Sequence, residues 1–155
     1  KTFNIAGIVS SFAVIHNKDI QEKYLSFLSP RELDKGTIQA YVATEAAYNS
    51  GEAWLDEATD YIENNIQFVD NYFKSNIPQI KVINPESMFL LWLDCKELGL
   101  SHSELEDLFV NKARLALNSG IMFGREGTGF MRLNVGVPQS VLKTAMDNLN
   151  KAVNG

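Results

Sequence analysis

The sequence predicts an α/β or α+β fold, because stretches with the apolar spacing of helices and stretches typical of strands follow one another along its 155 residues. Helical patterns dominate the first half, and short strand-like segments separated by turns and helices dominate the second. Apolar residues make up 45% of the chain and charged residues 21%, which is the composition of a folded domain and excludes a disordered chain.

The N-terminal part is predicted to form one buried strand and two helices. Residues 9–15 are apolar and rich in small or β-branched side chains, which favours a strand. Residues 19–28 have apolar side chains at helical spacing, and Pro30 ends that helix. Residues 37–49 form an alanine-rich helical stretch that stops at Gly51.

One long amphipathic helix is predicted next. From Ala53 the apolar side chains keep helical spacing for about twenty residues, and the pattern stops before Pro78. The stripe consists of Trp54, Leu55, Ala58, Ile62, Ile66, Val69 and Phe73. A helix of that length measures about 30 Å, enough to bridge two structural layers or two domains.

Three short segments after Pro78 have the pattern of strands. They are residues 80–83, 88–93 and 130–137. The turn Asn84-Pro85-Glu86 separates the first two. Two helices complete this half of the chain. Ser101 and Glu104 have the spacing of a capping box ahead of an apolar stripe that reaches Ala116, and Pro138 suits the first turn of the last helix.

Charge and hydropathy exclude two classes of partner. Fourteen Lys and Arg residues against nineteen Asp and Glu give a net charge of −5 without a basic block, so nucleic acid is not the expected partner. The longest apolar run, residues 88–93, is far shorter than the ~20 residues that span a bilayer. The single cysteine, Cys95, excludes an intrachain disulfide and fits a reducing compartment. The chain begins at Lys1 and not at a methionine, so we expect it to be the tail of a longer protein.

Lys1 is the first candidate for chemistry. It leads through Gly7 into the predicted strand, which places it at the mouth of a sheet. A desolvated amine there becomes nucleophilic, as Schiff-base chemistry requires. Taken alone, a solvated lysine without a function is the simpler interpretation.

Arg132 is the second candidate. The alternation of the strand at residues 130–137 puts Phe130, Arg132 and Asn134 on one face, opposite an apolar face. An arginine inside such a strand is costly unless its guanidinium meets a carboxylate or a phosphate. A clamp for a substrate carboxylate and an internal ion pair with Asp or Glu are equally compatible with the pattern.

The remaining polar and glycine-rich features have structural interpretations. Gly124, Gly127 and Gly129 precede a strand, whereas a dinucleotide-binding loop precedes a helix, so that function is rejected. A flexible turn beside a ligand and a plain hairpin turn both fit. His102 is interpreted as part of a helix start, and without a Cys/His cluster no metal site is predicted. Cys95 is interpreted as a packing residue.

Four segments together resemble a known family. They are Lys1-Thr2-Phe3-Asn4-Ile5-Ala6-Gly7, residues 46–55 with 61–65, residues 87–94 and residues 124–134. In this order they resemble the lysine segment, the interdomain helix and the small domain of fold-type-I enzymes that depend on pyridoxal 5'-phosphate (PLP). The resemblance is to the cystathionine β-lyase (C–S lyase) branch of the class I/II aminotransferase superfamily.

The resemblance implies the C-terminal portion of the PLP-dependent transferase (aspartate aminotransferase-like) fold. Residues 1–52 would end the large cofactor-binding domain, and residues 53–155 would form the interdomain helix and the small α+β domain. Lys1 would bind PLP as a Schiff base and then, as the catalytic base, remove the Cα proton of the substrate. Arg132 would bind the substrate α-carboxylate. Many aminotransferases of the superfamily have a phosphate-binding arginine shortly after the lysine; residues 7–10 lack one, which favours the lyase branch.

The activity implied by the resemblance is β-elimination. Cystathionine or a related cysteine S-conjugate would give a thiol, pyruvate and ammonia. An aminotransferase uses the same lysine and arginine but returns the proton to the cofactor, and a non-catalytic, ligand-sensing homologue would keep both residues without turnover. The family further implies a small amino-acid substrate and a homodimer in the cytoplasm.

Overall fold

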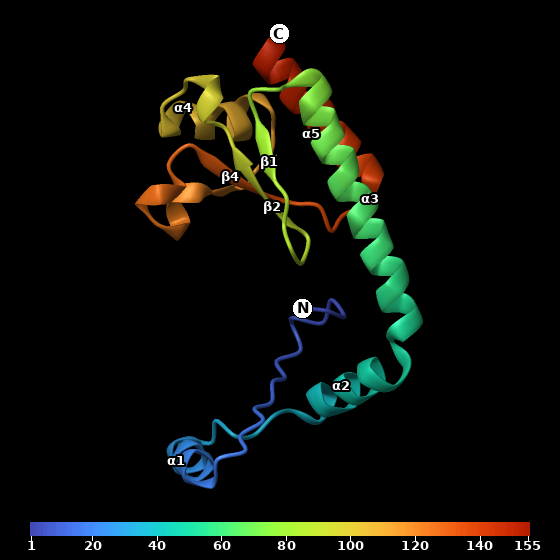
Figure 1. Cartoon of the computed structure of the whole chain (residues 1–155), viewed down its shortest axis with the longest axis vertical. Helices are drawn as coiled ribbons and strands as arrows, with labels where there is room; N and C mark the ends of the chain where they lie inside the picture. The colour runs from blue at the N-terminus through green and yellow to red at the C-terminus, as the bar shows by residue number, and fades with distance from the viewer. The chain divides into compact units, whose positions relative to one another are not determined.

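The computed structural model describes all 155 residues, which divide into two compact units, Lys1–Glu57 and Ala58–Gly155. The predicted combination of helices with a sheet is confirmed (Figure 1). None of the helices is both long and apolar enough to cross a membrane.

The helices of the first unit are confirmed close to their predicted bounds. Helix α1 covers Lys18–Leu28, and helix α2 covers Ile38–Ser50. Each begins at a side chain that caps free backbone N–H groups, because Asn17 accepts from Ile20 and Thr37 accepts from Ala40. A short 3₁₀ turn, Ser29–Arg31, follows α1 and contains the proline that ends it.

The predicted strand at residues 9–15 is wrong. These residues have no regular secondary structure. A strand exists only through hydrogen bonds to a neighbouring strand, and none lies beside this segment. Val9 is 84% exposed and Phe12 is 75% exposed. Ala40 is the one buried residue of Lys1–Glu57, so this unit lacks a hydrophobic core of its own.

The predicted long helix is confirmed as α3, Glu52–Asn76. In the second unit it packs beside the C-terminal helix α5, Gln139–Asn154, and the Tyr72 hydroxyl donates to the Asp147 carboxylate over 2.8 Å (Figure 1). The buried face of α3 contributes Val69 and Phe73 to the core of this unit.

Four antiparallel strands form the sheet of the second unit. They are β1 (Lys81–Ile83), β2 (Leu90–Asp94), β3 (Asn118–Ser119) and β4 (Phe130–Asn134), in the spatial order β1-β2-β4-β3. Alternation in β2 and β4 sends Leu91, Leu93, Met131 and Leu133 into the core. The same alternation leaves Trp92, Phe130 and Arg132 on the opposite face, as predicted for β4.

The helix expected to run from Ser101 to Ala116 is shorter than predicted. Its capping box is confirmed, but α4 covers only His102–Asp107 and continues as one π-helical turn, Leu108–Lys112. Arg114 has a positive φ of 61°, a conformation that ends a right-handed helix. The chain then extends into β3, a two-residue strand too short to produce a sequence pattern.

Two side chains of α3 hold the connection between β4 and α5. The buried Asn65 amide donates to the carbonyl oxygens of Val135 and Val137, both at 2.9 Å. One turn earlier, the Tyr61 hydroxyl accepts from the backbone N–H of Gln139 at 2.8 Å. The end of β4 is therefore fixed to α3 by polar contacts as well as by the core.

Candidate functional site

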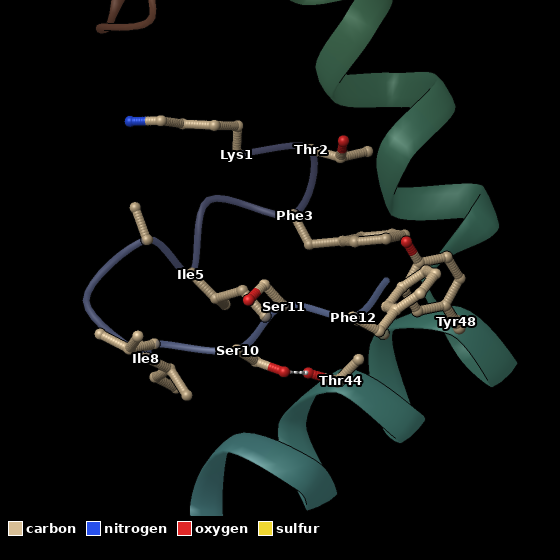
Figure 2. Close-up of a pocket in the computed structure, with 13 residues that line it drawn as sticks. Lys1, Thr2, Phe3, Ile5, Ile8, Ser10, Ser11, Phe12, Thr44 and Tyr48 are labelled. Carbon is tan, nitrogen blue, oxygen red and sulfur yellow. Dashed lines mark hydrogen bonds between the residues drawn. The ribbon is translucent and has the colours of Figure 1, made fainter. Parts of the chain in front are cut away.

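The two candidate residues lie in different units, and each has its own surroundings. Lys1 lines a cavity of about 540 Å³ formed by the first twelve residues and α2 (Figure 2). The Lys1 carbonyl accepts from the backbone N–H of Asn4 at 3.0 Å, which closes a turn directly after the lysine. Figure 2 shows the Lys1 side chain extending away from α2, with its amine free of intramolecular contacts among the residues drawn.

Hydroxyl groups line the same cavity. They belong to Thr2, Ser10, Ser11, Thr44 and Tyr48. Thr44 Oγ1 lies 2.7 Å from the Ala40 carbonyl oxygen and 3.0 Å from Ser10 Oγ. Since a carbonyl can only accept, the single Thr44 hydrogen goes to Ala40, and Ser10 donates to Thr44. The cavity thus offers one amine and several hydroxyls to a polar ligand.

An aromatic contact fixes the lysine segment on the end of α2. The Phe3 ring packs edge-on against Tyr48, with 5.7 Å between ring centroids, and also contacts Trp54. Gly51, the residue after α2, makes room for this ring, because a Cβ there would lie 2.7 Å from the Phe3 ring. Gly51 is therefore required both by the helix end and by the placement of the residues next to Lys1.

Arg132 lies in the middle of β4, between Trp92 of β2 and Asn118 of β3 in the sheet register. Its Nη2 donates to the Asn118 Oδ1 over 2.7 Å, and its guanidinium carbon lies 4.7 Å from the centroid of the Phe123 ring. The buried Nε has no hydrogen-bond partner. None of the Asp and Glu side chains of these 155 residues forms an ion pair with this guanidinium.

Aromatic side chains pack together beside Arg132, and one of them, Phe123, contacts its guanidinium. Trp92 stacks on Phe130 with 5.4 Å between centroids and meets Phe123 edge-on at 5.6 Å. Lys96 also packs on Phe130, with its Nζ 4.2 Å from the ring centroid. Arg132 is half-buried, and Phe123 covers part of its guanidinium. A carboxylate that pairs with the guanidinium there is less exposed to water than at an open surface, which strengthens the attraction between the two charges.

The glycine-rich segment connects β3 to β4 through two 3₁₀ turns, Gly120–Phe123 and Arg125–Gly127. Gly120 and Gly127 pack against each other so closely that a Cβ on either would overlap the backbone of the other. The segment therefore joins the antiparallel strands β3 and β4, but it is a packed loop and not a plain hairpin turn. This packing places Phe123 over Arg132.

His102 has a larger role than the helix start assigned to it. Its Nδ1 accepts from the backbone N–H of Gly129 at 3.1 Å, and its Nε2 lies 2.7 Å from Ser119 Oγ. These contacts join α4 to the two segments that flank β4. Sequence reasoning missed them because the partners lie 17 and 27 residues away.

Cys95 behaves as predicted for a packing residue. Its side chain is buried, and burial raises the pKa of the thiol to about 12. A thiol with that pKa is protonated at neutral pH and is not a nucleophile. No group of three or more His, Cys, Asp or Glu side chains is arranged to hold a metal ion.

Comparisons with known proteins match this architecture to the fold of PLP-dependent enzymes related to aminotransferases. No family model matches the sequence. Over its whole length the chain is nevertheless homologous to cystathionine β-lyases and PLP-dependent aminotransferases. It is 35% identical to cystathionine β-lyase PatB of Bacillus subtilis and 31% identical to protein MalY of Escherichia coli, each match covering 99% of this chain and 40% of the relative.

Solved structures give the same result. A PLP-bound putative aminotransferase from Clostridium difficile superimposes with a TM-score of 0.93 and 40% identity, over 99% of this chain and 40% of that one. The chain thus spans about two-fifths of the length of the relatives that it matches. The resemblance seen in the sequence and the fold it implies are confirmed.

The residues around Lys1 fit PLP in their chemistry. A primary amine is the group that bonds to an aldehyde cofactor, and neighbouring hydroxyls can hydrogen-bond to phosphate oxygens. Lys1 is the only cationic side chain that lines this cavity. The cavity itself therefore supplies no second cation for the phosphate, in agreement with the missing arginine after the lysine segment.

Proposed function

We propose that this chain carries the cofactor-binding lysine and the carboxylate-binding arginine of a PLP-dependent C–S β-lyase. Its substrates would be cystathionine or related cysteine S-conjugates, and its products a thiol, pyruvate and ammonia. The observation that carries the proposal concerns Arg132. Its guanidinium is held by Asn118 and Phe123, yet it forms no ion pair with a carboxylate of these residues. The homology to cystathionine β-lyases supports the lyase chemistry.

Lys1 has two tasks under this proposal. Its Nζ would hold PLP covalently, and the hydroxyls of the same cavity, such as Ser10 and Ser11, would orient the polar groups of the cofactor. As a free amine, Nζ would take the proton from Cα of the substrate. When bound, PLP supplies an electron sink for the charge left on that carbon.

Arg132 orients the substrate. One hydrogen of Nη2 is used by Asn118, and the remaining guanidinium N–H groups can pair with the two oxygens of an α-carboxylate. The neutral amide of Asn118 orients the guanidinium without neutralising it. The positive charge therefore stays available to the substrate.

Aminotransferase activity is the second candidate, favoured by the similarity to a putative aminotransferase structure. Both reactions need a lysine that moves the Cα proton and an arginine for the carboxylate. They differ in where that proton goes afterwards, so the products distinguish them. Pyruvate released without a keto-acid acceptor indicates the lyase.

We further propose the cellular context of the protein. Residues 1–52 would belong to a large cofactor-binding domain, and residues 53–155 would form the interdomain helix and the small domain. A homodimer is supported by the exposed apolar side chains of Lys1–Glu57, among them Phe12 and Val14, which need a covering surface. A cytoplasmic location is supported by the single, reduced Cys95.

The test is borohydride reduction of the purified protein supplied with PLP, followed by peptide mapping and by an assay for pyruvate from cystathionine. A pyridoxyl group on Lys1 and pyruvate without an acceptor are expected. Lys1→Ala should lose both, whereas the control Lys18→Ala, at the exposed start of α1, should keep both. An adduct without pyruvate, together with amino-group transfer to a keto acid, would establish the aminotransferase. Unmodified Lys1 without turnover would refute the enzyme proposal.

A further inference from the structure

We propose that His102 is a positioning residue for Arg132, and that its neutral imidazole ties β3, which carries the Asn118 partner of the guanidinium, to the residue that precedes β4. The inference rests on the proposed function of Arg132 as the carboxylate site. It assigns a role in substrate binding to a residue that does not touch the guanidinium.

His102 connects β3 to the residue that precedes β4. Its side chain is only 12% exposed, although it stands at the first position of α4. On one side the imidazole contacts Ser119 in β3, the neighbour of Asn118. On the other side it accepts from Gly129, which directly precedes β4. Both strands are thereby connected to one ring.

The hydrogen bonds define the form of the imidazole. A backbone N–H can only donate, so Nδ1 must carry a lone pair, and the proton of the neutral ring is on Nε2. Nε2–H then donates to Ser119 Oγ, with the Glu106 carboxylate also 3.5 Å away. In a ring with protons on both nitrogens, Nδ1–H would face the Gly129 N–H, and two donors cannot form a hydrogen bond.

Two residues close to Ser119 in the sequence connect its contact with His102 to Arg132. Asn118, the preceding residue, accepts from Nη2. Phe123 follows in the 3₁₀ turn that starts at Gly120 and lies against the guanidinium. When Ser119 is released, both groups lose their fixed position. The guanidinium then samples orientations that bind a carboxylate less well, while the proton transfer assigned to Lys1 is unaffected.

The experiment compares steady-state kinetics of the PLP-loaded protein with a cysteine S-conjugate. His102→Ala should raise KM about tenfold with kcat within about twofold, since two hydrogen bonds are lost but no reacting group is touched. Ser103→Ala, the exposed next residue of the same helix, is the matched control and should leave both constants unchanged.

Two conservative variants separate the two contacts. Gln places an amide near the position of Nε2, so His102→Gln keeps a donor for Ser119 and should restore KM to within about threefold of the parent. His102→Asn places an oxygen near Nδ1 and keeps the contact with Gly129. Its KM should return toward the parent value by less than that of His102→Gln. Ser119→Ala removes the critical contact from the other side and should match His102→Ala. If His102→Ala does not fold, Ser119→Ala tests the same contact in its place.

A double-mutant cycle with Arg132→Ala distinguishes the inference from the function on which it rests. If His102 acts through Arg132, the KM of the double variant should equal that of Arg132→Ala alone. An unchanged KM in Arg132→Ala would overturn the proposed role of Arg132 itself. A raised KM in Arg132→Ala, with additive or absent effects of His102→Ala, would overturn only the positioning role.

A spectroscopic readout is independent of turnover. Trp92 contacts Phe123 and Phe130, so its fluorescence reports the packing around the guanidinium. In a background in which Trp92 is the only tryptophan of the protein, which includes Trp54→Phe, His102→Ala should shift the Trp92 emission, and Ser103→Ala should not. Emission identical to that of the background protein would contradict the proposed coupling between His102 and the segment that holds Arg132.

Discussion

Replacing Asn65 with aspartate tests how the end of β4 is fixed to α3. The Asn65 side chain is 1% exposed, and its amide nitrogen donates to two carbonyl oxygens, those of Val135 and Val137. Asn65→Asp keeps the shape of the side chain but replaces this double donor with a carboxylate. Two hydrogen bonds are lost, and a buried negative charge faces two carbonyl oxygens.

The expected cost follows from these contacts. Each lost hydrogen bond costs about 1 kcal/mol, and leaving buried acceptors unpaired beside a charge adds more, so the free energy of unfolding should fall by at least about 3 kcal/mol at pH 7. Asn65→Ala introduces no charge and also removes Oδ1, which has no partner, so its cost should be smaller, about 2 kcal/mol. Asn64→Asp, at the exposed preceding position, should change stability by less than about 0.5 kcal/mol.

Urea denaturation at several pH values measures these differences. Burial beside carbonyls raises the pKa of the introduced carboxyl in the folded state, so the folded state binds the proton more tightly than the unfolded state. The deficit of Asn65→Asp relative to the parent should therefore shrink as the pH falls through that raised pKa. Equal stabilities of Asn65→Asp and Asn64→Asp at pH 7 would refute the assigned contacts.

Three further predictions concern other parts of the second unit. Gly127→Ala should lower stability by about 2 kcal/mol in thermal unfolding, since its Cβ would overlap the backbone of Gly120. Cys95 should react with a thiol reagent at pH 8 only after unfolding, because burial raises its pKa to about 12; fast labelling of the folded protein would contradict this. Burial, followed by the hydrogen bond to Asp147, raises the pKa of Tyr72 from 10.0 to about 12. The folded state then holds this proton more tightly, so stability should fall between pH 10 and pH 12, and Tyr72→Phe should abolish that part of the loss.

Local signals made most of the helices predictable. The capping box predicted at Ser101 links residues three positions apart, and the caps at Asn17 and Thr37, which were not predicted, are equally local. The apolar stripe of α3 likewise repeats within the segment itself. Such information needs no knowledge of distant residues, and the corresponding starts are confirmed within one or two positions.

The errors arise where a structure depends on distant partners. Residues 9–15 have the composition of a strand, but pairing decides whether a strand forms, and composition does not encode the partner. The alternation of β4 predicted the face of Arg132, yet its partner Asn118 comes from a two-residue strand without a pattern of its own. His102 was missed for the same reason, because its contacts arise only once the loop before β4 is folded.

The scarcity of buried residues in Lys1–Glu57 bears on when each half of the proposed site becomes ordered. Arg132 belongs to a unit with its own core, so the fold of that unit alone holds its guanidinium before any substrate arrives. The segment of Lys1 is held by the ring of Phe3 but not by a core, since only Ala40 is buried in its unit. The order of the lysine segment must then be supplied by surfaces beyond these residues. Competence for catalysis would accordingly be acquired at assembly, with the carboxylate site preformed and the lysine fixed last.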